Sequence, residues 1–381
     1  MKFTKLSLIA ALAVTSAFAG ESTIGGDAKL FYGTSDANNA DLFNKNGATG
    51  NAAVSLDYSK EIADGISLNA GMTGISTLGL ESTLVSGVWA GAGETGVEDT
   101  AWIDVANVTA KLGNTTAVLG RQKLDTPLAF TETWNIVENT FDAFTFVNTD
   151  VTDTTLVGSL VTRANGNTIA NFNNLQGGMT DLGDGIYTAG VVTKLIPSTT
   201  AQLWYYDFAN NDDKIWAQAD IDVVEGVTVG LQYAQALANT GDDSSVVAGK
   251  VAYDANGMGL YAAYSKADDK GTNSFANYGG FGMSNLYTEA WWNFGYVSKV
   301  GAQAISVGAS TDMSGLALTA QYTDVTNDSN LAADEMSEIT LTASKTIAGV
   351  DTSLALINTA SDVDALDGNT VQAYLTVPFS L

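Results

Sequence analysis

Charged side chains of both signs gather in one segment of the chain, between residues 121 and 142. Two bases lie close in sequence to four acids there, namely Arg121, Lys123, Asp125, Glu132, Glu138 and Asp142. If this segment folded into a channel, its opposite charges would face one another across the opening. The resulting transverse field would order water and select solutes by charge and dipole. The alternative is an ordinary external loop whose charges are simply solvated.

Two residue types that carry much of enzyme chemistry are missing. The 381 residues include neither Cys nor His. This excludes a disulfide framework, a thiolate or imidazole zinc site and a Ser-His-Asp triad. Carboxylate chemistry and oxygen-ligated metals remain possible, but no motif for either is present. The sequence therefore predicts that the protein is not an enzyme.

Acidic residues dominate the long polar segments of the chain. The 42 Asp and Glu outnumber the 16 Lys and Arg and give a formal net charge of −26, so nucleic-acid binding, which needs a basic face, is excluded. The acidic segments are a solvated surface, a funnel that concentrates cations at a channel mouth, or sites for Ca²⁺. The group most similar to a calcium loop lacks the Gly and closing Glu of an EF-hand: Asp362, Asp364 and Asp367.

The first nineteen residues have the pattern of a secretory signal peptide. Lys2 and Lys5 precede an apolar run from Leu6 to Val14, and Ala17-Phe18-Ala19 supplies a small-x-small cleavage site. The run is shorter than the ~20 apolar residues that a membrane-spanning helix needs. We therefore expect a signal peptide at 1–19 and a single domain at 20–381.

Apolar and polar residues alternate with a period of two through most of the remaining chain, which is typical of β-strands with two different faces. One clear segment sets Ala52, Val54, Leu56 and Tyr58 against Ala53, Ser55, Asp57 and Ser59. In another segment, Asp220 and Asp222 share the polar face. Ionised carboxylates face neither lipid nor a dry core, so we expect both on a wet inner wall.

Two fold classes fit this alternation. A soluble β-sandwich or β-helix would also bury one face and leave the other wet. Aromatic residues at predicted strand ends, such as Tyr58, Tyr233 and Tyr322, and segments of about ten residues instead favour a transmembrane antiparallel β-barrel.

Tight turns alternate with long polar segments, as in outer-membrane barrels. Predicted turns include Asp64-Gly65, Glu225-Gly226, Asn256-Gly257 and Ala348-Gly349. Nine long loops are predicted, at 36–48, 79–100, 123–140, 165–184, 209–213, 239–244, 267–296, 325–335 and 360–369. With both chain ends on the side of the turns, nine loops give about eighteen strands, with sixteen as the alternative. Barrels of this size enclose an aqueous channel.

One region resembles a known family. Gly120-Arg121-Gln122, then Asp125-Thr126-Pro127-Leu128, then Asn139-Thr140-Phe141-Asp142-Ala143 are similar to the third-loop region of the OprD-type porins. The similarity is greatest to the major outer-membrane porins of the Campylobacter and Arcobacter group. The resemblance implies an eighteen-stranded barrel, a third loop folded inward as a constriction, trimers and cation selectivity.

Transferred to this sequence, the resemblance makes Arg121 a base that faces the lumen, opposite Asp125, Glu132 and Glu138 on the acidic side. The chain departs from substrate-specific members in having only two arginines and no dense arginine ladder, and it ends in Leu381 instead of Phe.

These observations together predict a bacterial outer-membrane porin for passive diffusion of small hydrophilic solutes, with weak cation selectivity. Its expected partners are outer-membrane lipid, lipopolysaccharide, cations and two further copies of the chain in a homotrimer. The alternative is a surface or adhesive protein that a narrow or plugged barrel anchors in the membrane.

Overall fold

The computed structural model describes residues 22–80, 84–85, 99–133, 136–166, 178–208, 212–271, 274–327 and 335–381. The predicted signal peptide at 1–19 lies outside these residues. The described chain forms eighteen β-strands and three short 3-10 helices.

The first nine strands are β1 (Ser22–Ser35), β2 (Ala48–Ala63), β3 (Ile66–Ser76), β4 (Asp99–Leu112), β5 (Thr115–Gln122), β6 (Phe141–Asn148), β7 (Thr154–Ala164), β8 (Thr180–Thr193) and β9 (Thr199–Phe208). The other nine are β10 (Asp213–Val224), β11 (Val227–Leu237), β12 (Ser244–Ala255), β13 (Met258–Ala267), β14 (Ala302–Met313), β15 (Leu316–Asn327), β16 (Met336–Ile347), β17 (Val350–Ser361) and β18 (Gly368–Ser380). The 3-10 helices are η1 (Ala37–Asn39), η2 (Lys45–Gly47) and η4 (Tyr296–Ser298).

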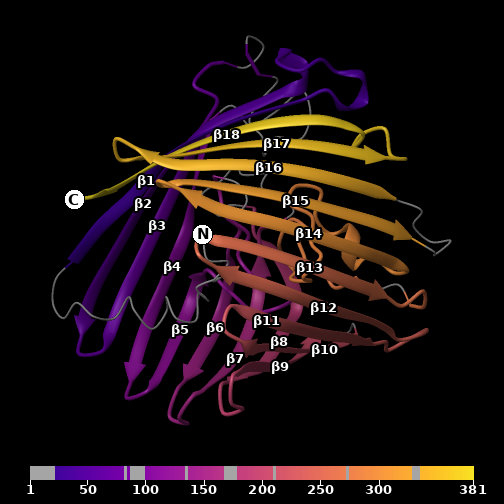
Figure 1. The fold of residues 1–381 in the computed structure, drawn as a ribbon. Helices are drawn as coiled ribbons and strands as arrows, with labels where there is room; N and C mark the ends of the chain where they lie inside the picture. Colours follow the sequence, from indigo (N-terminus) through magenta and orange to yellow (C-terminus); the bar gives the residue numbers. More distant parts are fainter. Residues whose placement is uncertain are drawn as a thin grey trace.

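The strands form one closed antiparallel barrel. Each strand pairs with the next along the chain, and β18 pairs with β1 from Gly25↔Ser380 to Ser35↔Thr370. Figure 1 shows the strands following one another around the wall in chain order. Because β1 and β18 pair with each other, neither the first nor the last strand is left as an open edge, which is what a sheet in lipid requires. The prediction of eighteen strands is confirmed, and the alternative of sixteen was wrong.

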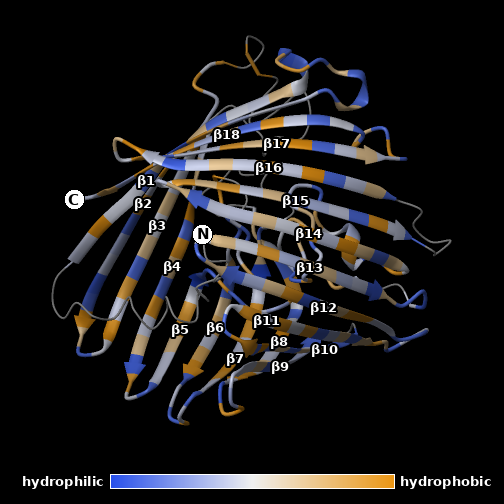
Figure 2. Ribbon diagram, viewed as in Figure 1, coloured by the Kyte–Doolittle hydropathy of each residue, from blue (hydrophilic) through white to orange (hydrophobic). Residues whose placement is uncertain are grey.

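The two faces of the wall differ in the way that the alternation predicted. Leu203 and Leu231 point outward and are each 53% exposed, whereas Trp204 and Trp216 point inward and are fully buried. Figure 2 shows the alternating hydrophobic and hydrophilic bands along the strands. A wall that is apolar outside and polar or tightly packed inside is the pattern of a barrel that stands in lipid.

Tyrosines on the outward face form a band toward the ends of the strands that carry the long loops. Tyr205, Tyr233 and Tyr322 are 43%, 39% and 39% exposed. Their hydroxyl groups donate to side chains nearer the loops, at 2.5 Å to Asp213, 3.0 Å to Gln235 and 3.2 Å to Asp324. An aromatic ring with a wet polar tip is suited to the boundary between hydrocarbon and headgroups.

The tight turns follow from residues that accept positive φ. Asn256 and Gly257 have φ of 53° and 77°, and Ala348 and Gly349 have φ of 52° and 85°. Positive φ at both central residues is the type I′ geometry, whose twist matches that of the flanking strands. The predicted turns at these positions are confirmed, whereas the turn at 149–153 between β6 and β7 was not predicted.

In the described part of the chain, no helix is long and apolar enough to cross a membrane.

Candidate functional site

The loop between β5 and β6, residues 123–140, folds into the barrel and is called the third loop below. Leu124, Leu128 and Ala129 are buried in a core cluster that includes Trp204 and Tyr206 of β9. The backbone N–H of Leu128 also donates to the Tyr206 hydroxyl at 3.2 Å. The apolar residues of the third loop therefore pack inside the barrel against β9.

A second loop, residues 268–301 between β13 and β14, also enters the barrel and is called the seventh loop. Phe275, Leu286, Ala290 and Val297 belong to the same core cluster as the third loop. The sequence analysis predicted this segment only as an external loop. Its apolar residues were the available signal, because a long loop carrying several large apolar side chains avoids water by packing against other parts of the chain.

Asn277 joins the two inner loops through its side-chain amide. Its Oδ1 accepts from the Phe130 N–H at 2.9 Å, and its Nδ2 donates to the Phe130 carbonyl at 2.7 Å and to Glu132 Oε1 at 2.9 Å. The Tyr278 N–H donates to the Leu128 carbonyl at 2.7 Å. The third and seventh loops thus form one connected unit inside the barrel.

Glu132 lies between the two loops and not in open space. Its side chain is 1% exposed, and Oε1 also accepts from the Met283 N–H at 3.2 Å. A Cβ on Gly280 would lie 2.2 Å from the same oxygen. The structure therefore places Glu132 in a packed contact, which differs from the solute-facing position that the resemblance implied.

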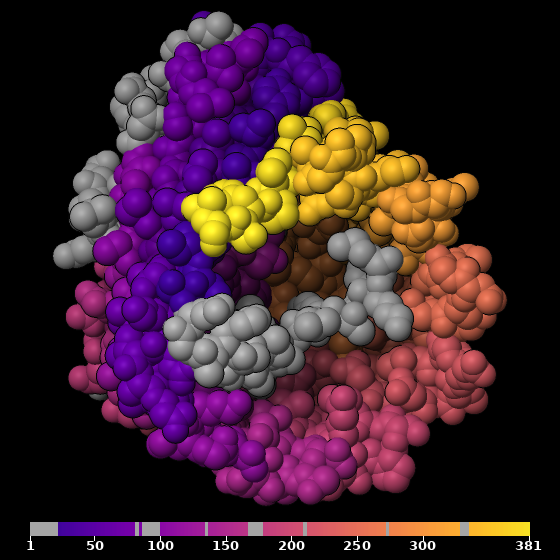
Figure 3. Space-filling view, turned by 90° about the vertical axis from the view of Figure 1, so that its left-hand side faces the viewer, coloured from indigo at the N-terminus to yellow at the C-terminus, as the bar shows by residue number. Residues whose placement is uncertain are grey.

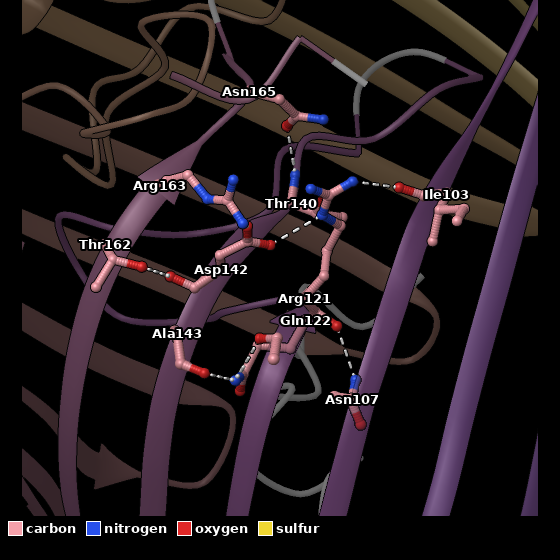
Figure 4. A network of polar contacts seen from close by, with 11 residues as sticks. Ile103, Asn107, Arg121, Gln122, Thr140, Asp142, Ala143, Thr162, Arg163 and Asn165 are labelled. Atoms are coloured by element: carbon pink, nitrogen blue, oxygen red, sulfur yellow. Dashed lines mark hydrogen bonds and ion pairs between the residues drawn. The ribbon is translucent and has the colours of Figure 1, made fainter. Parts of the chain in front are cut away.

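Arg121 also occupies a different place from the one expected. Its Nε donates to Asp142 Oδ1 at 2.9 Å, and Nη1 donates to the Ile103 carbonyl at 2.7 Å. Asp142 Oδ2 forms a second ion pair at 2.5 Å with Arg163 of β7. Figure 4 shows the Arg121 side chain extending past the end of β5, between Asp142 on one side and Ile103 on the other.

Strand alternation explains this position. Phe141 and Ala143 belong to the interior cluster, so Asp142 between them points away from the lumen. Arg121 pairs with Asp142 in register. The β4–β5 pairing ends at Ala106↔Arg121, and the Arg121 guanidinium fills the gap in the wall where β5 turns inward.

The charges that do share the interior lie around Lys123. Its ammonium forms an ion pair with Glu138 of the same loop, and the two side chains are 40% and 22% exposed. Burial lowers the pKa of Lys123, but the negative charges of Glu138, Asp104 and Asp57 outweigh burial and raise it overall. Lys123 is therefore a permanent cation beside an excess of carboxylates.

Asp57 and Asp104 come from β2 and β4, the two strands that flank β3. A Cβ on Gly71, which lies between them, would be 2.5 Å from Asp104 Oδ1 and 3.0 Å from Asp57 Oδ1. Both carboxylates thus flank one glycine on the inner wall. Strand alternation predicts Asp57 on a polar face, but an isolated Asp on a strand belongs to no motif, so neither residue was predicted as part of the site.

The same wall continues to β1, where Lys29 and Asp27 form an ion pair at 3.2 Å. The acidic wall is defined here as Asp27, Asp57, Asp104 and Glu138. Asp125, another predicted constriction residue, lies in the third loop, where its backbone bridges to Phe130.

Asp220 lies on the inner face of β10, where the sequence analysis expected it. It accepts from the Tyr287 hydroxyl at 2.8 Å and from Gln218 Nε2 at 2.7 Å, and Lys250 Nζ lies 4.0 Å away. Asp222 is exposed near the turn and accepts from Thr228 Oγ1 at 2.9 Å. Asp220 therefore helps to hold the seventh loop, whereas Asp222 is farther from both inner loops.

In the last loop, between β17 and β18, two acidic side chains accept hydrogen bonds from backbone N–H groups. Asp362 Oδ1 accepts from the Glu335 N–H at 3.1 Å, and Asp367 Oδ1 accepts from the Ser361 N–H at 3.3 Å. Asp364 contributes its backbone carbonyl to the Asn38 N–H at 3.2 Å. Within the described ranges, no three acidic side chains come together as metal ligands.

No family model matches the sequence, and no curated protein does. Solved structures match its fold. A BenF-like porin from Pseudomonas fluorescens Pf-5 is 12% identical with a TM-score of 0.78, and the match covers 95% of this chain and 99% of that one. OccAB4 of Acinetobacter baumannii is 14% identical with a TM-score of 0.78, covering 95% and 98%.

The outer membrane protein opdK from Pseudomonas aeruginosa is 15% identical with a TM-score of 0.76, covering 95% of this chain and 99% of that one. At sequence identities this low, the similarity is one of backbone fold. The chain therefore shares the eighteen-stranded barrel fold of known outer-membrane porins.

Proposed function

We propose that this chain is an outer-membrane porin and not an enzyme, and that it forms a water-filled channel for passive diffusion of small hydrophilic solutes. The observation that carries the proposal is a closed barrel whose inner wall bears charged side chains and whose interior is narrowed by two loops. Figure 3, turned to one end of the barrel, shows a hollow bounded by residues from both halves of the sequence. A barrel of this size is too wide for wall side chains alone to fill.

Weak cation selectivity is the finer part of the proposal. The acidic wall contributes four carboxylates, and Lys29 and Lys123 supply two ammonium groups beside it. The remaining negative charge lies against a low-dielectric barrel wall, which focuses the field into the channel. Cations are then enriched in the constriction, and anions are partly excluded.

The outer surface supports the membrane placement. Its exposed leucines and its tyrosine band would contact outer-membrane lipid and lipopolysaccharide. We further propose a signal peptide cleaved near Gly20, and a homotrimer on the resemblance of the third loop to OprD-type porins. N-terminal sequencing of the mature protein and its mass in detergent test these two points.

A second candidate function has one observation in its favour. The third and seventh loops share a packed apolar cluster, and a barrel plugged in this way would serve only to anchor a surface or adhesive protein. Such a barrel would carry no steady ionic current. The channel and the plug are therefore separable by conductance.

Neutralising the acidic wall tests the selectivity. The double variant Asp57→Asn, Asp104→Asn removes two lumen carboxylates while keeping their size, and the reversal potential in a KCl gradient should move toward zero. Glu225→Gln, which neutralises an exposed turn residue, is the matched control and should leave the potential unchanged. An unchanged potential in the double variant would remove the acidic wall from the conduction path.

A further inference from the structure

A buried carboxylate, Glu338 of β16, binds one stretch of the seventh loop to the barrel wall. Glu338 Oε1 accepts from the N–H groups of Trp291 and Trp292 at 2.9 Å and 3.0 Å. Its Oε2 accepts from the N–H and from Nδ2 of Asn293 at 2.8 Å and 2.9 Å. Thr340 Oγ1 donates to Oε1 at 3.1 Å. The carboxylate thus receives hydrogen bonds from three consecutive residues of the loop.

The position of the Glu338 side chain, which faces several hydrogen-bond donors of the loop, favours a negatively charged acceptor. Glu338 is 2% exposed, and among the described residues no Lys or Arg nitrogen lies within ion-pair distance of it. Oriented N–H dipoles take the place of a counter-cation, and they compensate the desolvation of the buried carboxylate. Removal of the carboxylate would take this acceptor away from the N–H groups of the loop.

Two other glutamates hold the rest of the loop. Glu289 folds the loop on itself by accepting from the N–H groups of Ser284, Ala290 and Gly295 at 2.6, 3.1 and 2.9 Å. Glu132 joins the loop to the third loop, as described above. Of these three carboxylates, Glu338 alone reaches the loop from a strand of the wall.

We propose that Glu338 is the positioning residue that keeps the seventh loop inside the barrel as one half of the constriction. This inference rests on the proposed channel function. The loop has further wall contacts, including Gln321 Nε2 to the Glu289 carbonyl at 2.8 Å and Ser265 to Thr288 at 2.6 Å. Without Glu338, the N–H groups of Trp291, Trp292 and Asn293 lose their acceptor on β16, so this stretch is held less firmly against that strand.

The substitution Glu338→Gln tests this role. In glutamine, an NH₂ group replaces one of the two carboxylate oxygens. Each of these oxygens accepts two hydrogen bonds from the loop, so whichever one is replaced, at least two of these bonds become donor–donor contacts. We expect a larger unitary conductance, more current noise and loss of the single conductance level. Glu225→Gln removes the same charge from an exposed turn and should behave like the wild type.

A crosslink separates loop position from loss of charge. Ser265 of β13 and Thr288 of the loop have their hydroxyl oxygens 2.6 Å apart, and the chain has no other Cys. In the triple variant Glu338→Gln, Ser265→Cys, Thr288→Cys, oxidation should return the conductance toward the wild-type level, and reductant should release it. If the conductance of the triple variant is the same in oxidant and in reductant, the effect of Glu338→Gln comes from the lost charge alone, and the positioning role is overturned.

The outcomes also distinguish this inference from the channel proposal. Absence of channels in the folded wild type would contradict the channel itself. Wild-type channels with unchanged conductance in Glu338→Gln would contradict only the role of Glu338. If Glu338→Gln fails to fold, Asn293→Ala removes the two side-chain bonds to Glu338 and Thr359 and keeps the charge. It should then show the same noise, and quiet channels would overturn the proposal.

Discussion

Arg121 shows how one residue can close a wall that the backbone leaves open. Where β5 turns inward, it no longer pairs with β4. There the Arg121 guanidinium donates hydrogen bonds to the Ile103 carbonyl and to the Asp142 carboxylate. The side chains of Arg121 and Asp142 are only 9% and 13% exposed. A buried pair of this kind costs much more to break than an exposed one.

We predict that Arg121→Ala lowers the free energy of unfolding by about 3 kcal/mol, because it leaves a buried carboxylate with one base fewer. Arg163→Ala is the matched comparison. Its side chain is 46% exposed, so the expected loss is below ~1 kcal/mol. Thermal unfolding in detergent micelles measures both, and equal losses would contradict the assignment of Arg121 to the wall gap.

Glu289 predicts a pH dependence. Burial raises the pKa of its carboxyl to about 7 from an ordinary value of 4.5, against three backbone N–H groups that favour the ionised form. A group whose pKa is higher in the folded protein stabilises the fold below its unfolded pKa. That stabilisation is lost as the pH rises through the folded pKa.

The barrel should therefore lose stability from this group between pH 4.5 and somewhat above 7, by roughly 3 kcal/mol. Melting temperatures of the wild type and of Glu289→Gln, compared from pH 4 to pH 8, measure the difference that belongs to this carboxyl. The melting temperature of the wild type should fall relative to that of Glu289→Gln as the pH rises, and parallel curves would contradict the prediction.

Turns set the register of the hairpins at the scale of the element. Ala348 holds a φ of 52° in the turn between β16 and β17, where a side chain with a Cβ costs roughly 1–2 kcal/mol. Ala348→Asn should raise the stability modestly, because Asn tolerates this conformation better.

Gly349→Ala should lower the stability of the same turn. The space around Gly349 is open and its φ is 85°, so any loss comes from the backbone alone and should be about 1–2 kcal/mol. Thermal unfolding of both variants tests the pair. A change in the same direction for both would rule out backbone conformation as the cause.

Elements with a regular period were predictable from the sequence, and those without one were not. The strand around Asp57 and the turn at Ala348 follow from alternation and from turn chemistry. The inward path of the seventh loop is indicated in the sequence only by its large apolar side chains, because the wall residue that binds it, Glu338, lies on another strand. The outward side of Arg121 depends on the exact phase of β5, and a shift of one residue reverses the face.

In the whole molecule, the barrel and its two inner loops have different roles. The closed wall satisfies its own backbone groups and stands in lipid, while the loops narrow the interior and the acidic wall charges it. In the proposed channel, four carboxylates beside two lysines would make the narrowed space attract cations. Sequence composition alone indicated the sign of this charge but not the strands that carry it.

In the proposed channel, solutes pass the acidic wall. The most direct measurement is the planar-bilayer conductance of the refolded protein, residues 20–381, in a KCl gradient. We predict ohmic steps with a reversal potential that favours K⁺. Silence from a protein whose barrel is shown to be folded would contradict the channel, and steps that favour Cl⁻ would contradict the role of the acidic wall.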